Sequence, residues 1–234
     1  MSGIEPLLEM QDVLPYFEQT VLPPAIYNFR VFAGQFILIE CRNAFRGNAF
    51  ADMCLGMVGL KTGSIRFMGL DWAKLQLQQK NALRGRVGRY PHIQGNWMNL
   101  LGTHFNIMFQ QLHHTKRETE EIVHEATALS RRFGLPGLPV EAPEMLSDVD
   151  RARAACVRAF MGSPSLVLLE YCLEDYLPEL KDPLFRTINN MQSTGTAVIS
   201  FTRDRFLWKD YNREISGFYR LRTEGLVVSR GGIQ

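Results

Sequence analysis

The stretch CRNAFRGN, residues 41–48, lies where a phosphate-binding loop is expected. An almost wholly apolar run, QFILIE, precedes it, and an amphipathic stretch, AFADMCLGMV, follows it. Strand, loop and helix in this order bring backbone N–H groups and the positive end of a helix to one anion. Such a loop also needs a lysine for the phosphate charge, and this one contains none. The position predicts a phosphate loop, and the residue types indicate one that has lost its chemistry.

The cysteines and histidines do not form a metal-ligand pattern. No CxxC spacing occurs, and the adjacent histidines in QLHHT would point in different directions on a helix. The sequence therefore predicts no metal site. Cysteines in apolar surroundings without such a spacing are typical of buried free thiols in a reducing compartment. They are Cys41, Cys54, Cys156 and Cys172.

Composition narrows the class of protein. The chain has 234 residues, 46% of them hydrophobic, and 26 Lys+Arg against 24 Asp+Glu give a formal net charge of +2. Nucleic-acid binders usually carry a basic stripe, and no long basic run is present, so nucleic acid is not an expected partner.

The start, MSGIEPLLEM, lacks the basic and apolar regions of a signal peptide. No apolar stretch approaches the roughly 20 residues that span a bilayer. These features predict a cytoplasmic protein.

Apolar patterning predicts an α/β chain with a helical segment in its middle. The almost wholly apolar runs QFILIEC, SLVLLEY and TAVISFT are typical of strands covered on both faces. Strands are expected within 7–32, 35–41, 64–69, 85–91, 165–171, 196–202 and 214–230. Helices are expected at 48–58, 72–84, 97–112, 116–134, 149–161, 180–192 and 204–211.

The order of these elements resembles the nucleotide-binding subunit of ABC transporters. The resemblance covers nearly the whole chain, and GMVGLKTGSIRFMG and EMLSDVDRARAACVRAFMGSPSLVLLEY carry it. It implies an ABC-type P-loop NTPase fold, with a mostly parallel sheet core, an inserted helical subdomain and an antiparallel N-terminal β part. Residues 1–234 would form one ABC-ATPase-like domain, with its core at 1–90 and 163–234 and the helical insert at about 91–162. The lipid-trafficking subunits of the Mla type are the most similar branch.

The resemblance also assigns the nucleotide-binding positions. The GxxGxGK[ST] loop of the family falls on residues 41–48, with Gly47 at the lysine and Asn48 at the Ser/Thr that holds Mg²⁺. A shift by one residue puts Asn48 at the lysine, so neither register supplies one. Arg42 or Arg46 could approach a phosphate instead, or could simply be solvated. The degenerate nucleotide-binding positions are Tyr16, Cys41, Asn43, Ala44, Arg46, Gly47, Asn48, Ala49 and His92.

The catalytic positions implied by the resemblance have changed as well. Glu170 stands where an aspartate would hold Mg²⁺, and Tyr171 stands where a glutamate would polarise the attacking water. A tyrosine cannot act as a base near neutral pH, because its ordinary pKa is about 10. His92 replaces the glutamine of the lid loop, and Arg203 replaces the histidine of the switch. The resemblance therefore implies that no catalytic residue is intact.

The signature loop of the family corresponds to LSDVD, which is Leu146, Ser147, Asp148, Val149 and Asp150. A carboxylate here would repel a nearby triphosphate by about 1–4 kcal/mol at the effective dielectrics of a protein surface. The alternative, which we favour, is that these residues cap a helix, with Ser147 or Asp148 as the N-cap and acids in the first turn.

These substitutions predict a catalytically inactive, pseudo-ATPase subunit that docks on a membrane permease. The partners would be an integral membrane permease and an intact ATPase paralogue, and the chain would lie peripherally on the inner face of the membrane. Tyr90, Trp97 and Met98 are the expected permease contacts, although Trp97 and Met98 could equally be core residues of the helical insert. No cofactor is expected, with ATP and Mg²⁺ bound weakly at most.

Two other functions remain open from the sequence. One is an ABC-type subunit that still binds or weakly hydrolyses ATP, using Arg46 and Glu170. The other is a soluble regulatory scaffold with the same fold and no permease.

Overall fold

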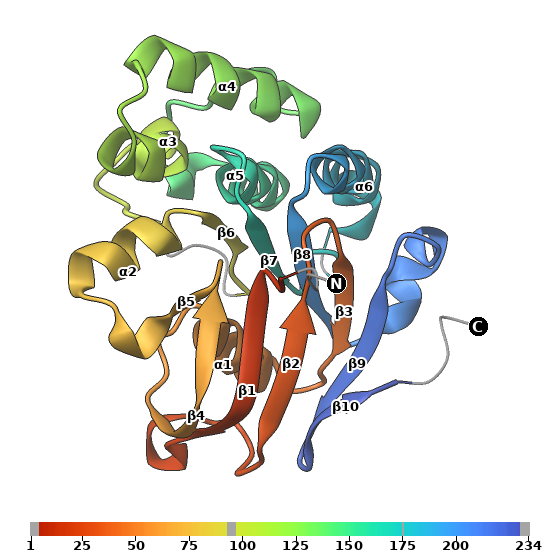
Figure 1. Cartoon of the computed structure of the whole chain (residues 1–234). Coiled ribbons are helices and arrows are strands. Elements are labelled where there is room, and N and C mark those ends of the chain that lie inside the picture. Colours follow the sequence, from red (N-terminus) through yellow and green to blue (C-terminus); the bar gives the residue numbers. More distant parts are fainter. Residues whose placement is uncertain (1–4, 93–96, 175, 230–234) are drawn as a thin grey trace.

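The computed structural model describes residues 5–92, 97–174 and 176–229. These residues form a sheet with the strand order β2-β1-β4-β5 and a second sheet with the order β10-β9-β3-β8-β7-β6. Figure 1 shows the helices α3, α4, α5 and α6 gathered at one end of the molecule, beyond the strands. The mixed α/β architecture expected from the sequence is confirmed.

The first sheet is antiparallel and comes from the N-terminal part of the chain. Its strands are β1 (Leu8–Pro15), β2 (Tyr27–Val31), β4 (Leu60–Phe67) and β5 (Leu70–Asp71). In β2 buried and exposed residues alternate, because successive side chains of a strand point to opposite faces. One face of this sheet therefore contributes to the core and the other faces solvent.

The second sheet is mostly parallel and positions the candidate site. Its strands are β3 (Phe36–Glu40), β6 (Val87–Tyr90), β7 (Leu166–Glu170), β8 (Ala197–Thr202), β9 (Gly217–Arg222) and β10 (Gly225–Val228). β7 and β8 are buried along their whole length. β3 and β7 both pair with β8 in parallel, so the carboxyl ends of these strands meet at one edge. The residues that follow them are brought together there.

Helices cover both faces of the parallel sheet. They are α1 (Ala44–Cys54), α2 (Leu77–Arg84), α3 (Thr103–His114), α4 (Thr119–Arg132), α5 (Asp148–Phe160) and α6 (Leu177–Ser193). The short 3-10 helices are η1 (Phe17–Gln19), η2 (Trp72–Lys74), η3 (Pro143–Met145) and η4 (Arg205–Tyr211). α1 belongs to a core shared with the antiparallel sheet, whereas α3–α6 contribute to a core on the other face.

Several predicted helices differ from the structure at their ends or in their type. The helix predicted at 48–58 is α1, which begins at Ala44 and ends at Cys54. The helix predicted at 97–112 begins only at Thr103, because the Asn106 side chain binds the backbone of the preceding turn. The helix predicted at 72–84 is split into η2 and α2, since Leu75 and Gln76 are extended and Gln76 starts α2 with a capping box. The helix predicted at 204–211 is the 3-10 helix η4.

In the part of the chain that the structure describes, no helix combines the length and the apolar character that crossing a bilayer requires.

Phe50 tests the core that holds α1. Its ring lies edge-on to Tyr27, Phe29 and Phe201, with centroid distances of 5.9, 5.6 and 6.1 Å. We expect Phe50→Ala to lower the free energy of unfolding by about 3–5 kcal/mol, because it leaves a cavity among these rings. Urea unfolding measures the loss. Phe45→Ala on the same helix is the control, since Phe45 is 68% exposed, and equal losses in both variants would contradict the assignment of Phe50 to the core.

Candidate functional site

The loop at the phosphate position is short and closed by its own hydrogen bonds. β3 ends at Glu40 and α1 begins at Ala44. Asn43 caps α1, because its side-chain oxygen accepts a hydrogen bond from the Arg46 N–H at 3.3 Å. The Asn43 carbonyl also accepts from the N–H groups of Arg46 and Gly47 at 3.1 and 3.2 Å. The N–H groups of Arg46 and Gly47 are therefore already bonded within the chain.

Tyr171, the residue after β7, fills the space beside the first turn of α1. Its side chain is buried, and its hydroxyl donates to the Cys41 carbonyl at 3.1 Å. A Cβ atom added at Gly47 would lie 2.2 Å from the Tyr171 Oη. Gly47, at the expected lysine position, thus leaves the room that the tyrosine occupies.

The backbone and the chemistry of Tyr171 are both unusual. Its φ of +58° lies in the left-handed region, which costs a residue with a Cβ roughly 1–2 kcal/mol. Burial raises the pKa of Tyr171 above its ordinary value. The side chain therefore remains a neutral hydroxyl at physiological pH and acts as a hydrogen-bond donor.

Arg89 of β6 ties the expected metal position to two other elements. Its guanidinium forms an ion pair with the fully buried Glu170 and donates to Asp52 of α1 at 2.7 Å. Asn48, with its amide turned so that both atoms find partners, donates to Glu170 Oε2 at 2.9 Å. Burial raises the pKa of Glu170, and Arg89 opposes that shift. The carboxylate that would face a metal ion is therefore held by groups of the chain itself.

His92 and Arg203 both contact the ring of Tyr171, and they line one pocket with the residues at the start of α1. The Arg203 guanidinium lies over the Tyr171 ring, 4.9 Å from its centroid, and also pairs with Glu174. Arg203 Nη2 lies 3.0 Å from His92 Nε2. The His92 ring meets the Tyr171 ring edge-on at 4.7 Å. The structure thus brings together the residues expected at the lid, base and switch positions, and packs them against one another.

Four other predicted nucleotide-binding positions lie at the border of the cluster around Tyr171 or away from it. They are Tyr16, Cys41, Ala44 and Ala49. Tyr16 is 42% exposed, and its N–H donates to the carbonyl of Gly59. Cys41 and Ala44 are buried in the same core as α1, and Ala49 packs against that core. Burial raises the pKa of the Cys41 thiol, which donates to the Asn43 carbonyl.

The predicted signature residues form a helix N-terminus. The Ser147 hydroxyl accepts from the Asp150 N–H at 3.1 Å, and so caps α5. Asp148 forms an ion pair with Arg151, and Asp150 forms one with Arg153. Val149 lies in the first turn of α5, and Leu146 packs against the core that α5 helps to build. The alternative that we favoured from the sequence, a capped helix, agrees with this geometry.

The three expected permease contacts have different degrees of exposure. Tyr90 is 4% exposed and belongs to the core on the side of α5. Trp97 is partly buried against the same core, with the Arg158 guanidinium 4.2 Å from the centre of its ring. Burial lowers the pKa of Arg158 to about 10. Met98 is 38% exposed and lies at the surface. Residues 93–96, which lie between Tyr90 and Trp97 in the sequence, are outside the described residues.

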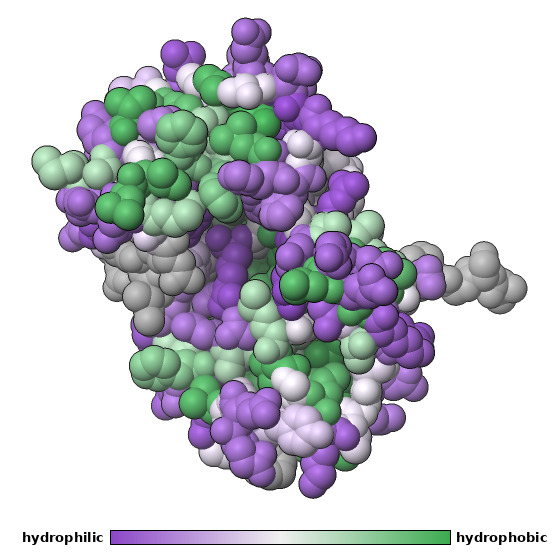
Figure 2. All heavy atoms as spheres, turned by 90° about the vertical axis from the view of Figure 1, so that its left-hand side faces the viewer, coloured by the Kyte–Doolittle hydropathy of each residue, from purple (hydrophilic) through white to green (hydrophobic). Residues whose placement is uncertain are grey.

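Met98 lines a cavity of about 300 Å³ between the parallel sheet and α3. Its other walls include Val87, Pro91, Phe109 and Arg158. Figure 2 shows this side of the molecule, hollowed between an upper and a lower part, with hydrophobic atoms gathered above the hollow. Of the three expected permease contacts, Met98 lines this cavity, whereas Tyr90 and Trp97 are not among its lining residues.

Three residues that organise these sites were not predicted from the sequence. Asn106 donates to the carbonyls of Met98, Leu101 and Gly102, and so shapes the turn before α3. Arg89 pairs with Glu170, and Glu174 pairs with Arg203. No local pattern marks Arg89 or Glu174, because each pairs with a residue that is far away in the sequence.

Known proteins resemble this chain in part of its sequence and in its fold. No family model matches the chain. Octopine permease ATP-binding protein P of Rhizobium meliloti is 27% identical over 154 residues, which are 66% of this chain. The chain spans 57% of the length of that relative.

Solved structures cover more of this chain than that relative does. The dimeric MJ0796, a bacterial ABC transporter cassette, matches with a TM-score of 0.80 at 15% identity, over 96% of this chain and 99% of that one. An ATP-binding subunit of an ABC transporter matches with a TM-score of 0.78 at 19% identity, over 97% and 90%. cbiO1 of Clostridium perfringens matches with a TM-score of 0.75 at 15% identity, over 96% and 88%. The chain therefore has the fold of an ATP-binding cassette, of the P-loop NTPase type.

Gly47 tests the packing of Tyr171 against α1. In an exposed helix Gly→Ala would stabilise the protein by about 0.5–1 kcal/mol. We expect Gly47→Ala to destabilise it by about 1–3 kcal/mol instead, because the new methyl group overlaps the Tyr171 hydroxyl. Denaturant unfolding measures the stability of Gly47→Ala, of Tyr171→Phe and of the double variant Gly47→Ala/Tyr171→Phe.

The control for this prediction is Gly137→Ala, since no heavy atom lies within 4 Å of a Cβ built there. The double variant should lose less stability than the sum of the two single variants, because removing the hydroxyl relieves the overlap. Additive losses would show that the two side chains do not meet.

Proposed function

We propose that this chain is a non-hydrolysing subunit with an ATP-binding-cassette fold, which docks on an integral membrane permease and pairs with an intact ATPase subunit. One observation carries the proposal: the Tyr171 hydroxyl lies where the side chain of residue 47 would begin, 2.2 Å from a Cβ at Gly47. The phosphate position is thereby filled by the protein itself. The contact between Tyr171 and the first turn of α1 explains why a tyrosine at 171 and a glycine at 47 occur together.

The residues at this position do not fit Mg-ATP, which proteins of this fold bind. A phosphate loop needs free N–H groups, a lysine and a hydroxyl for the metal. Here the N–H groups of Arg46 and Gly47 are bonded to Asn43, and Asn48 can reach Glu170. Glu170 is fully buried and paired with Arg89. An ion at this carboxylate would have to displace a guanidinium from a desolvated pair, which is costly.

Docking on a permease is supported by the cavity beside Met98 and by two similar proteins. Met98 and Phe109 are each 38% exposed, and with Val87 and Pro91 they form the apolar part of the cavity lining. Octopine permease ATP-binding protein P is named for a permease, and cbiO1 is described as part of the transporter complex cbiONQ. By this proposal the chain lies on the inner face of the membrane through its permease. The transported molecules are lipids in this proposal, on the resemblance to the Mla-type subunits alone.

The purified chain should neither hydrolyse ATP nor be stabilised by it. Losing a group that stabilises the transition state often costs roughly 10²–10³ in rate, and several such groups are replaced here. A coupled phosphate-release assay and thermal unfolding with millimolar Mg-ATP are the measurements. Turnover that Glu170→Gln removes would favour the active ATPase with Arg46 and Glu170. A Mg-dependent upward shift without turnover would favour a subunit that only binds nucleotide.

Charge placed in the cavity beside Met98 should release the chain from its membrane complex. Met98→Asp and Phe109→Asp each put a carboxylate where an apolar partner would be, and burying it unpaired costs several kcal/mol. Co-purification with native membranes measures the loss. Val228→Asp is the control, because Val228 is 62% exposed on β10. Complexes that survive both changes would exclude this contact, and a chain isolated only as a free monomer would favour the soluble scaffold.

A further inference from the structure

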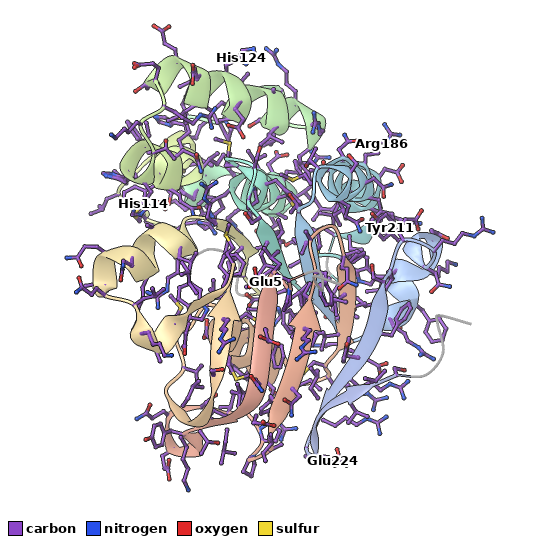
Figure 3. The ribbon with its side chains drawn as sticks, in the orientation of Figure 1. Glu5, His114, His124, Arg186, Tyr211 and Glu224 are labelled. Atoms are coloured by element: carbon purple, nitrogen blue, oxygen red, sulfur yellow. The ribbon has the colours of Figure 1, made fainter. Side chains whose placement is uncertain are left out.

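A second cavity lies beside α1, on the side of the β9–β10 hairpin, and has a volume of about 390 Å³. This volume is within the range of small-molecule sites, roughly 300–1,000 Å³. Figure 3 labels Glu224 at the tip of the hairpin, at the end of the molecule opposite the helices α3 and α4. We call the cavity beside α1 the arginine cavity. Its charged lining residues are Arg42, Arg46, Arg220, Arg222, Glu40 and Glu224.

The parallel pairing of β3 and β9 creates this cavity. Glu40, the last residue of β3, lies opposite Arg220 of β9. Arg222 lies two residues further along β9 and therefore points to the same face as Arg220. The chain continues from Glu40 into the loop and the first turn of α1, which contribute Arg42 and Arg46. Segments about 180 residues apart are thus joined into one wall.

Positive charge in the arginine cavity exceeds negative charge. Arg220 pairs with Glu40 at 3.1 Å. Within the described residues, Arg42, Arg46 and Arg222 have no ion pair. Guanidinium groups remain charged at all physiological pH values, so they repel one another around the cavity. A bound anion would turn that repulsion into attraction.

The side chains favour one kind of anion. Guanidinium forks match the oxygen geometry of phosphate groups and can donate two parallel hydrogen bonds. Glu40 and Glu224 can only accept hydrogen bonds when ionised, so they suit hydroxyl or amino groups on the same ligand. Tyr171 does not line this cavity. The arginine cavity therefore shares Arg42, Asn43 and Arg46 with the loop at 41–48, but does not include the space that Tyr171 fills.

We propose that the arginine cavity binds a soluble phosphate ester, with its phosphate groups between Arg46 and Arg222 and its hydroxyl or amino groups toward Glu40 and Glu224. The site does not depend on nucleotide at the phosphate loop. The chain would sense a phosphorylated small molecule although its own nucleotide position is filled.

Calorimetry with inorganic pyrophosphate, without Mg²⁺, tests the site. We expect saturable binding that Arg222→Gln and Arg46→Gln each weaken about tenfold or more, since each removes a charge-assisted hydrogen bond. Arg213→Gln is the control, because it removes the same charge from an exposed residue outside the cavity. Thermal unfolding of each variant verifies that it is folded.

Three outcomes would overturn the proposal. One is an absence of pyrophosphate binding by the folded wild-type chain. Another is binding that Arg203→Gln removes and Arg222→Gln does not, which would place the anion beside Tyr171 and would also count against the proposed function. The third is binding only to vesicles that contain anionic phospholipid, which would identify a headgroup surface instead of a soluble ligand.

Discussion

The contact of the Tyr171 hydroxyl with the first turn of α1 is the constraint on which the rest of the candidate site depends. It requires Gly47, because any Cβ at that position would overlap the hydroxyl. It requires a left-handed backbone directly after β7, at φ +58°. In exchange the hydroxyl bonds to the Cys41 carbonyl at the end of β3. One side chain therefore joins the loop after β3 to the loop after β7, where proteins of this fold hold a phosphate.

The charged residues around Tyr171 follow from the same constraint. A buried carboxylate without a metal ion needs another partner, and Glu170 finds Arg89. Arg203 would be an unpaired cation beside an apolar ring, but it lies over the Tyr171 face and pairs with Glu174. These contacts replace ligand contacts with internal ones. These residues are consequently packed against one another, and a single substitution such as Gly47→Lys would meet a filled space.

The surfaces that remain open lie on different sides of this closed centre. The cavity beside Met98 combines apolar side chains, among them Met98 and Phe109, with polar ones such as Arg158, and this mixture suits a protein partner. The arginine cavity on the hairpin side is charged and suits an anion. Under the proposed function, these two surfaces would contribute shape and regulation to an assembly in which another chain supplies hydrolysis.

The sequence by itself determined the α/β class, the strands at 35–41, 165–171 and 196–202, and the absence of a lysine from residues 41–48, because hydrophobic periodicity and residue type are local properties. It also predicted that Ser147 or Asp148 caps α5, and the structure has Ser147 as the cap. Only the tertiary structure decided that Tyr171 occupies the space above Gly47, that Arg89 holds Glu170, and that Arg46 and Arg222 line one cavity. Each of these depends on residues distant in sequence. Their meeting is fixed by the parallel pairing of β3, β7, β8 and β9, which no local pattern encodes.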